Sequence, residues 1–243
     1  MRVDGMKDRH WDAISEKIGQ VLKPYPGFTL QHVLDMNLLK FEDDITDIGE
    51  KAQKQYQIEC SLAKMKNDWE EVCFILKPFK KTNTYTISTF EEPNTLTDDH
   101  MVVTQTMQFS SFRGPFEDEI NEWNATLLFV VDVLDEWGRC QKDWTYLQPI
   151  FDSPDIMKQL PSESKRFKAV DKTWKEIMAY TKTTPNVLKT CIRDEKNLLG
   201  KFRDCNVALD KVQRGLKEYL ESKCAVFARF YFLADTDLLE ILS

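Results

Sequence analysis

Glycine is scarce in this chain, with eight residues among 243, and these glycines form no phosphate-binding loop. Neither GxxxxGK[ST] nor GxGxxG occurs, so the chain has no phosphate cradle of its own. Histidine is scarcer: His10, His32 and His100 have no partner at the spacing of metal ligands. From these absences we expect a segment that is not an enzyme, with no catalytic residue, no cofactor and no metal.

Long apolar runs are also missing, since none approaches the ~20 residues that span a bilayer. The N-terminal segment is charged and lacks the apolar centre of a signal peptide. The six cysteines form no CxxC pair, which favours free thiols in a reducing compartment. A net charge of −7 disfavours non-specific binding to nucleic acid. We therefore expect neither a membrane nor a nucleic acid as a partner.

Apolar residues at helical spacing dominate the rest of the sequence. The longest stripe starts at Phe116 and continues to Trp144, which predicts one helix of about 30 residues, roughly 45 Å long. A second stripe, from Leu198 to Tyr219, repeats at alternating steps of four and three. The composition, 42% hydrophobic and 30% charged, is that of a globular protein. These patterns predict a mostly α fold, an elongated array of packed helices.

Two segments change from the helical period to a strand pattern. Residues 71–79 and 83–89 are predicted to be two strands joined by a turn, with Pro78 at an edge or a strand end. The aromatic segment 229–233 is predicted to be a buried terminal strand. After it, Asp237 and Glu240 have the spacing of a capping box that opens a helix. The expected organisation is a helical region over 1–70, a β-hairpin insert at about 71–90, a second helical region over 91–225 and a terminal strand and junction over 226–243.

Clusters of acidic residues are the one feature of the sequence that is compatible with catalysis. Paired carboxylates such as Glu117 and Asp118 are compatible with a hydrolase in principle. The clusters stand at predicted helix starts, where acids interact favourably with the helix dipole, so a hydrolase is the least favoured hypothesis. The six tryptophans all fall on apolar stripes, which indicates core packing, with some of them open to an interface role.

Several segments together resemble the linker region of dynein heavy chains, in order and over essentially the whole chain. They are DRHWDAISEKIG (8–19), VLDMNL (33–38), DWEEVCFILKPFKKTNTYTI (68–87), VVTQTM (102–107), PFEDEINEW (115–123), WTYLQPIFDSPDIMKQLPSESKRFKAVDKTWKEIM (144–178) and YLESKCAVFARFYFLADTDLLEILS (219–243). VLDMNL and TNTYTI are more similar to axonemal than to cytoplasmic dyneins. One departure is Phe227-Ala228-Arg229-Phe230, where the family usually has proline at the second position.

The resemblance implies a mechanical linker that bends and straightens over the ring of ATPase modules to produce force along microtubules. It implies the ring modules of the same heavy chain as partners, microtubules as indirect ones, and a cytoskeletal location in the axoneme of a cilium or flagellum. Candidate hinge or compliance points are Gly114, Gly138, Pro149 and Pro161. Candidate ring-junction residues are Arg229, Phe230, Asp237, Leu238 and Glu240. The alternative is a static helical scaffold or tail segment that assembles heavy chains and binds accessory chains.

Overall fold

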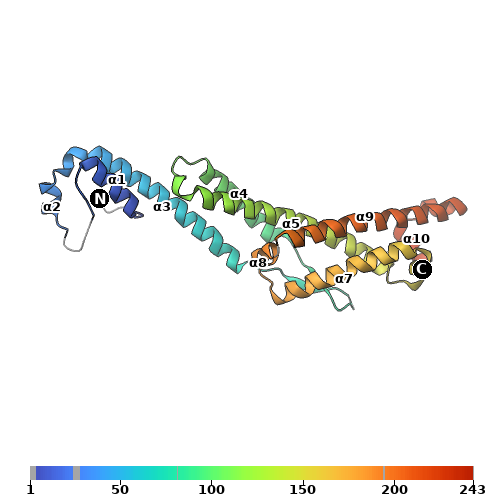
Figure 1. The fold of residues 1–243 in the computed structure, drawn as a ribbon. Coiled ribbons are helices and arrows are strands. Elements are labelled where there is room, and N and C mark those ends of the chain that lie inside the picture. The colour runs from blue at the N-terminus through green and yellow to red at the C-terminus, as the bar shows by residue number, and fades with distance from the viewer. Residues whose placement is uncertain (1–3, 24–27, 81, 194, 243) are drawn as a thin grey trace. The chain divides into compact units, whose positions relative to one another are not determined.

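The computed structural model describes residues 4–23, 28–80, 82–193 and 195–242, and most of them are helical, as predicted (Figure 1). The chain forms two compact units. Unit 1 comprises Met1–Asp68 and His100–Ala125, and unit 2 comprises Trp69–Asp99 and Thr126–Ser243. Three long helices contribute residues to both units: α3 (Glu42–Glu71), α4 (Glu91–Gln108) and α5 (Glu117–Ile150). The expected division into four consecutive regions stays a prediction.

Unit 1 surrounds a small apolar core of Ile14, Leu22 and Leu38. Its shorter elements are α1 (Asp8–Ile18), α2 (Leu30–Asp35) and the 3₁₀ helices η1 (Leu38–Phe41) and η2 (Gly114–Phe116). Helix α1 ends where Gly19 adopts the left-handed conformation, with φ of 74°. Leu22, expected on the helical stripe, lies beyond that end but is still buried.

A buried histidine ties α1 to α3 within unit 1. His10 Nδ1 accepts the backbone N–H of Lys7 at 3.0 Å, so the ring proton is on Nε2, which donates to Gln55 Oε1 at 2.9 Å. Arg9 donates to the same oxygen at 2.8 Å. Burial, with a smaller contribution from the charge of Arg9, lowers the pKa of His10 and keeps the ring neutral. The histidine is therefore a satisfied core residue.

Unit 2 is built on three helices: α5, α7 (Pro161–Thr183) and α9 (Glu195–Val226). Stacked rings join α5 to α7, with centroids 5.1 Å apart for Trp144 and Trp174, and Trp137 contacts Phe202 of α9 at 4.9 Å. Helices α7 and α9 pack directly against each other (Figure 1). The tryptophans on these stripes are core residues, as expected. The helix predicted from Phe116 to Trp144 is continuous from Glu117 onward, and Val130 is fully buried in its core-facing side.

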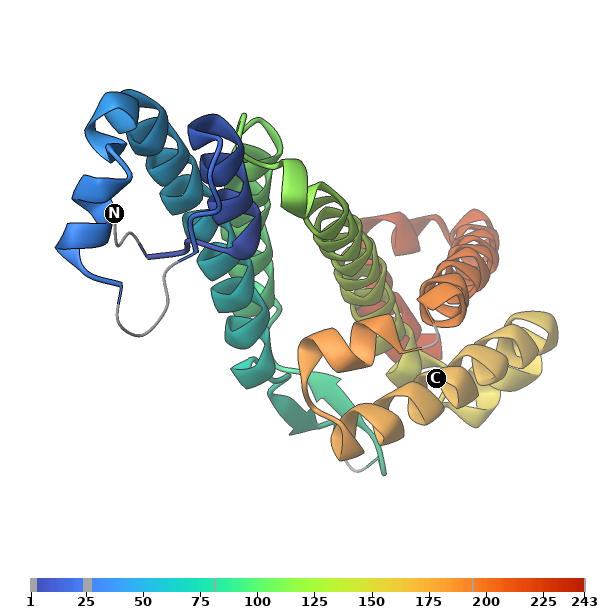
Figure 2. The same ribbon diagram turned by 60° about the vertical axis from the view of Figure 1, so that its left-hand side comes forward.

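The predicted hairpin is present, with shorter strands than expected. Strands β1 (Leu76–Pro78) and β2 (Tyr85–Ile87) form a small antiparallel pair (Figure 2). In its register Lys77 lies opposite Thr86. Gln141 of α5 attaches β2 to the helices: its Oε1 accepts the Ile87 N–H at 2.7 Å and its Nε2 donates to the Ile87 carbonyl at 2.8 Å. Pro78 is the last residue of its strand.

The predicted terminal strand is wrong. The segment forms a 3₁₀ helix, η3 (Ala228–Phe232), in which Phe232 is 91% exposed. A strand needs a neighbour for its backbone groups, and the two strands that the structure describes pair with each other. The segment instead makes local bonds, from Phe230 N–H to the Phe227 carbonyl at 2.9 Å and from Leu233 N–H to the Phe230 carbonyl at 3.1 Å.

The helix expected after this segment exists as α10 (Asp235–Leu242). It begins at Asp235, two residues before the Asp237 predicted from the capping-box spacing, so Asp237 lies inside its first turn. The side chain of Glu240 lies outside the described side chains. The remaining short helices of unit 2 are α6 (Pro154–Gln159) and α8 (Val187–Ile192). Ser153 precedes α6, and Asn186 caps α8.

Candidate functional site

The two candidate glycine hinges lie in different backbone settings. Gly114 is the first residue of η2, and a Cβ added there would meet no atom within 4 Å. Gly138 lies in the middle of α5, and a Cβ added there would be 4.0 Å from the ring of Phe90, an ordinary contact. Neither glycine adopts a backbone conformation that excludes other residues. Their hinge role stays a prediction.

The two candidate proline hinges lie at helix ends on either side of α6. Pro149 occupies the last turn of α5, where its ring removes one backbone donor from the helix. Pro161 is the first residue of α7, a position where the missing N–H has no intrahelical partner to lose. The four hinge candidates therefore belong to η2, α5 and α7 and are not gathered at one point.

The end of α9 and the segment after it expose five apolar residues, called here the aromatic surface: Val226, Phe227, Tyr231, Phe232 and Leu233. Their exposed fractions run from 37% at Leu233 to 91% at Phe232. Phe227 and Phe230 make an edge-to-face contact, with centroids 4.9 Å apart. The candidate junction residues Arg229 and Phe230 thus belong to a short helix in which Tyr231 is 66% and Phe232 91% exposed. Such an area is typical of a surface that binds another protein surface.

Helix α10 is held to unit 2 by one of the candidate junction residues. Leu238 is 1% exposed, and its backbone N–H donates to the Ala234 carbonyl at 3.0 Å. Asp237 is exposed. Partial burial raises the pKa of Tyr146 in α5, and the charge of Asp235 nearby adds to that rise. The structure therefore places Leu238 as the anchor of α10 and Asp237 on its solvent side.

Sequence reasoning missed a backbone clamp at Asn186. Its Nδ2 donates to the carbonyls of Trp69 at 2.8 Å, Glu70 at 3.1 Å and Val72 at 3.2 Å. Its Oδ1 accepts the Lys189 N–H at 2.9 Å and so caps α8. One amide therefore satisfies the end of α3 and the start of α8 together. The sequence signal was its place before a short apolar segment, but its partners at the end of α3 lie 114 to 117 residues away.

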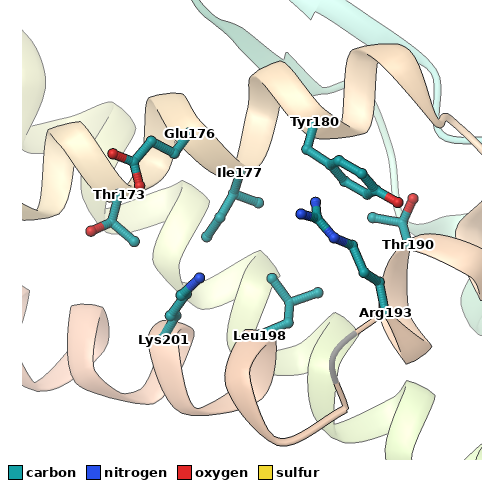
Figure 3. A pocket seen from close by; sticks show the side chains of 8 residues that line it. All are labelled: Thr173, Glu176, Ile177, Tyr180, Thr190, Arg193, Leu198 and Lys201. Carbon is teal, nitrogen blue, oxygen red and sulfur yellow. The ribbon is translucent and has the colours of Figure 1, made fainter.

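Sequence reasoning also missed a pocket on unit 2. Its walls come from α7, α8 and α9, and it encloses about 190 Å³ (Figure 3). It is lined by Thr173, Glu176, Ile177, Tyr180, Thr190, Arg193, Leu198 and Lys201. The spacing of these residues along the sequence, on three separate helices, gave no hint of a shared cavity.

Neither a metal site nor a membrane span is found in the part of the chain that the structure describes. No group of three or more His, Cys, Asp or Glu residues lies close enough there to hold an ion. No described helix combines the length and the apolar composition that crossing a bilayer requires.

The family model "Dynein heavy chain, N-terminal region 2" matches residues 1–243 of the chain. The chain belongs to this dynein heavy chain family. It is 44% identical over its whole length to dynein axonemal heavy chain 1 of Rattus norvegicus, 41% identical over 98% to dynein axonemal heavy chain 3 of Mus musculus, and 39% identical over 98% to dynein axonemal heavy chain 12 of Homo sapiens. The chain spans 5%, 6% and 8% of those three relatives.

Membership in the dynein heavy chain family confirms the resemblance expected from the quoted segments. The relatives bear axonemal names, in agreement with the subtype expected from VLDMNL and TNTYTI. The match is to an N-terminal region of a motor protein, and this dynein segment contains no phosphate-binding loop in its sequence.

Proposed function

We propose that this dynein segment is a lever that transmits force between the ATPase ring of its heavy chain and the tail. The observation that carries the proposal is the packing of α5, α7 and α9 in unit 2. Helices α5 and α9, 34 and 32 residues long, are held together laterally by buried rings and by Arg139, which donates to both carboxylate oxygens of Asp210 at 2.9 Å. Helices fixed side by side resist bending far better than single ones, as a lever requires.

In this proposal the aromatic surface and α10 form the junction with the ring. Tyr231 and Phe232 would be covered by the first ATPase module, and Leu238 would keep the adjoining helix attached to unit 2. Docked states that cover different areas of this surface would differ in free energy. The size of this difference would depend on which nucleotide is bound. The same proposal includes a hinge at one of the four candidates, Gly114, Gly138, Pro149 or Pro161.

The parent protein is proposed to be an ATP-driven motor of a ciliary or flagellar axoneme. Its partners would be the ring modules of the same heavy chain, and microtubules would be reached through the complete motor. The axonemal names of the relatives support this location. The segment itself would hydrolyse no ATP.

The test measures one distance in the complete motor. A fluorophore at Lys217, which is exposed on α9, is paired with a second one on the ATPase ring, after Cys60 and Cys73 have been replaced by serine. We expect at least two distances that interchange with the nucleotide state. A single distance in every nucleotide state would overturn the lever.

A static scaffold that binds accessory chains is the second candidate, favoured by the same exposed aromatic surface. The gene sequence downstream of the segment distinguishes the two candidates. A lever is followed there by an ATPase module with a phosphate-binding loop, and a scaffold by further helical bundle.

A further inference from the structure

The pocket between α7, α8 and α9 contains an arginine, Arg193, whose side chain is already restricted by an aromatic contact. The guanidinium carbon of Arg193 lies 3.4 Å from the centroid of the Tyr180 ring (Figure 3). At that distance the planar guanidinium stacks on the ring face and keeps the N–H groups at its edge free to donate. Because stacking already restricts the side chain, binding a ligand costs less conformational entropy there than at a mobile arginine.

A second cation faces the same space. Lys201 of α9 points into the pocket (Figure 3). In the described portion of the chain neither Arg193 nor Lys201 forms an ion pair, whereas other cations of these helices do. Examples are Lys175 with Asp171 at 2.6 Å and Arg203 with Asp132 at 3.2 Å. The two cations share the lining with one carboxylate, Glu176, so these three side chains give the cavity a net positive charge.

The other residues that line the pocket limit the kind of ligand that fits it. Ile177 and Leu198 provide an apolar wall between the two cations. The volume of about 190 Å³ lies below the roughly 300–1,000 Å³ of pockets that enclose drug-sized molecules, so a single side chain fits better. A ligand with an apolar stem and an anionic head matches this wall and these charges.

We infer that this pocket binds a glutamate side chain presented by a segment of a partner protein. The carboxylate pairs with the edge of Arg193 and the methylene groups pack on Ile177 and Leu198, while Lys201 adds a second positive charge at the other end of the lining. Glu176, beside Thr173 in the lining, adds a negative charge that disfavours a second carboxylate, so an isolated glutamate is preferred over an acidic run. The inference does not depend on the lever, because it rests on the pocket alone.

The test uses two blocked peptides, acetyl-Ala-Ala-Glu-Ala-Ala-amide and its glutamine counterpart. Methyl NMR of the 243-residue chain follows the Ile177 and Leu198 methyl groups, which report on the pocket directly. We expect saturable shifts at low-millimolar glutamate peptide and binding at least about tenfold weaker for the glutamine peptide, since a charge-assisted pair is roughly twice as strong as a neutral one. Added salt should weaken the binding of the glutamate peptide and leave the binding of the glutamine peptide unchanged.

The matched variants are Arg193→Gln and Arg166→Gln. Both arginines are exposed, but Arg166 of α7 pairs with Glu163 at 3.5 Å and does not line the pocket. The Arg193 variant should lose the glutamate-peptide shifts, and the Arg166 variant should keep them. Equal binding of both peptides, retained binding in the Arg193 variant, or no saturable shift by about 10 mM peptide would overturn the inference.

Discussion

A single amide, Asn186, satisfies backbone groups of two helices. Replacing it by alanine leaves the carbonyls of Trp69, Glu70 and Val72 without this donor and removes the cap of α8. Buried acceptors that lose their donor are costly, as is a lost cap. We expect Asn186→Ala to lower the free energy of unfolding by about 2–3 kcal/mol, measured by urea denaturation.

Two further variants separate the donor role of Asn186 from its capping role. Asn186→Asp keeps an acceptor for the Lys189 N–H but sets a carboxylate against three carbonyl oxygens, so it should destabilise at least as much as alanine. Asn121→Ala, at an exposed asparagine that accepts one bond from Gln108, should change stability by less than about 0.5 kcal/mol. A near-native Asn186→Asp protein would contradict the donor role.

Residue types and their local spacing predicted some of these roles. The six tryptophans on helical stripes were expected in the core because their spacing is local information, and those of α5 and α7 pack there. The role of Asn186 could not be predicted, because the carbonyls to which it donates lie 114 to 117 residues away in the sequence. The pocket around Arg193 was missed for a different reason, because its lining residues lie close in sequence but come together only when the helices pack.

At the scale of elements, periodicity located the long helices well because each buries one continuous face. The predicted strand at 229–233 failed because aromatic content favours strands only when a neighbouring strand exists. Propensity alone could not supply that neighbour. The start of α10 was displaced by two residues, since Asp235 and Asp237 both suit a first turn.

The glycine in the middle of α5, Gly138, permits a test of stiffness. A helix interior favours alanine over glycine by about 0.5–1 kcal/mol, and the added Cβ meets Phe90 at an ordinary 4.0 Å. Gly138→Ala should therefore raise the free energy of unfolding. If Gly138 is the compliance point of the proposed lever, the same variant reduces the nucleotide-driven change in distance in the complete motor.

The matched control is Gly200→Ala in α9, where an added Cβ meets nothing within 4 Å. It should stabilise the chain by a similar amount and leave the motion unchanged. Equal motion in both variants would remove Gly138 from the hinge candidates and leave Gly114, Pro149 and Pro161.

For the whole chain, the aromatic surface predicts self-association in isolation. Burying one phenylalanine contributes about 1.5–3 kcal/mol, and Phe232 and Tyr231 are largely exposed. We expect the purified 243-residue chain to gain mass with concentration in sedimentation velocity, and Tyr231→Ser with Phe232→Ser to suppress that gain. Phe109→Ser, at a residue 87% exposed outside this surface, is the control. A monomer that persists at all concentrations would contradict the prediction.

The two hydrogen bonds between Gln141 and Ile87 affect how readily a neighbouring copy can add a strand to this sheet. An amide side chain that offers one acceptor and one donor reproduces the bonding pattern of a third strand, so the outer edge of β2 is already occupied at Ile87. On the other edge, Pro78 has no N–H to offer. At Ile87 and at Pro78, a neighbouring chain therefore finds fewer backbone groups with which to extend this sheet. Copies packed closely together would then meet mainly through side-chain surfaces and less through this sheet.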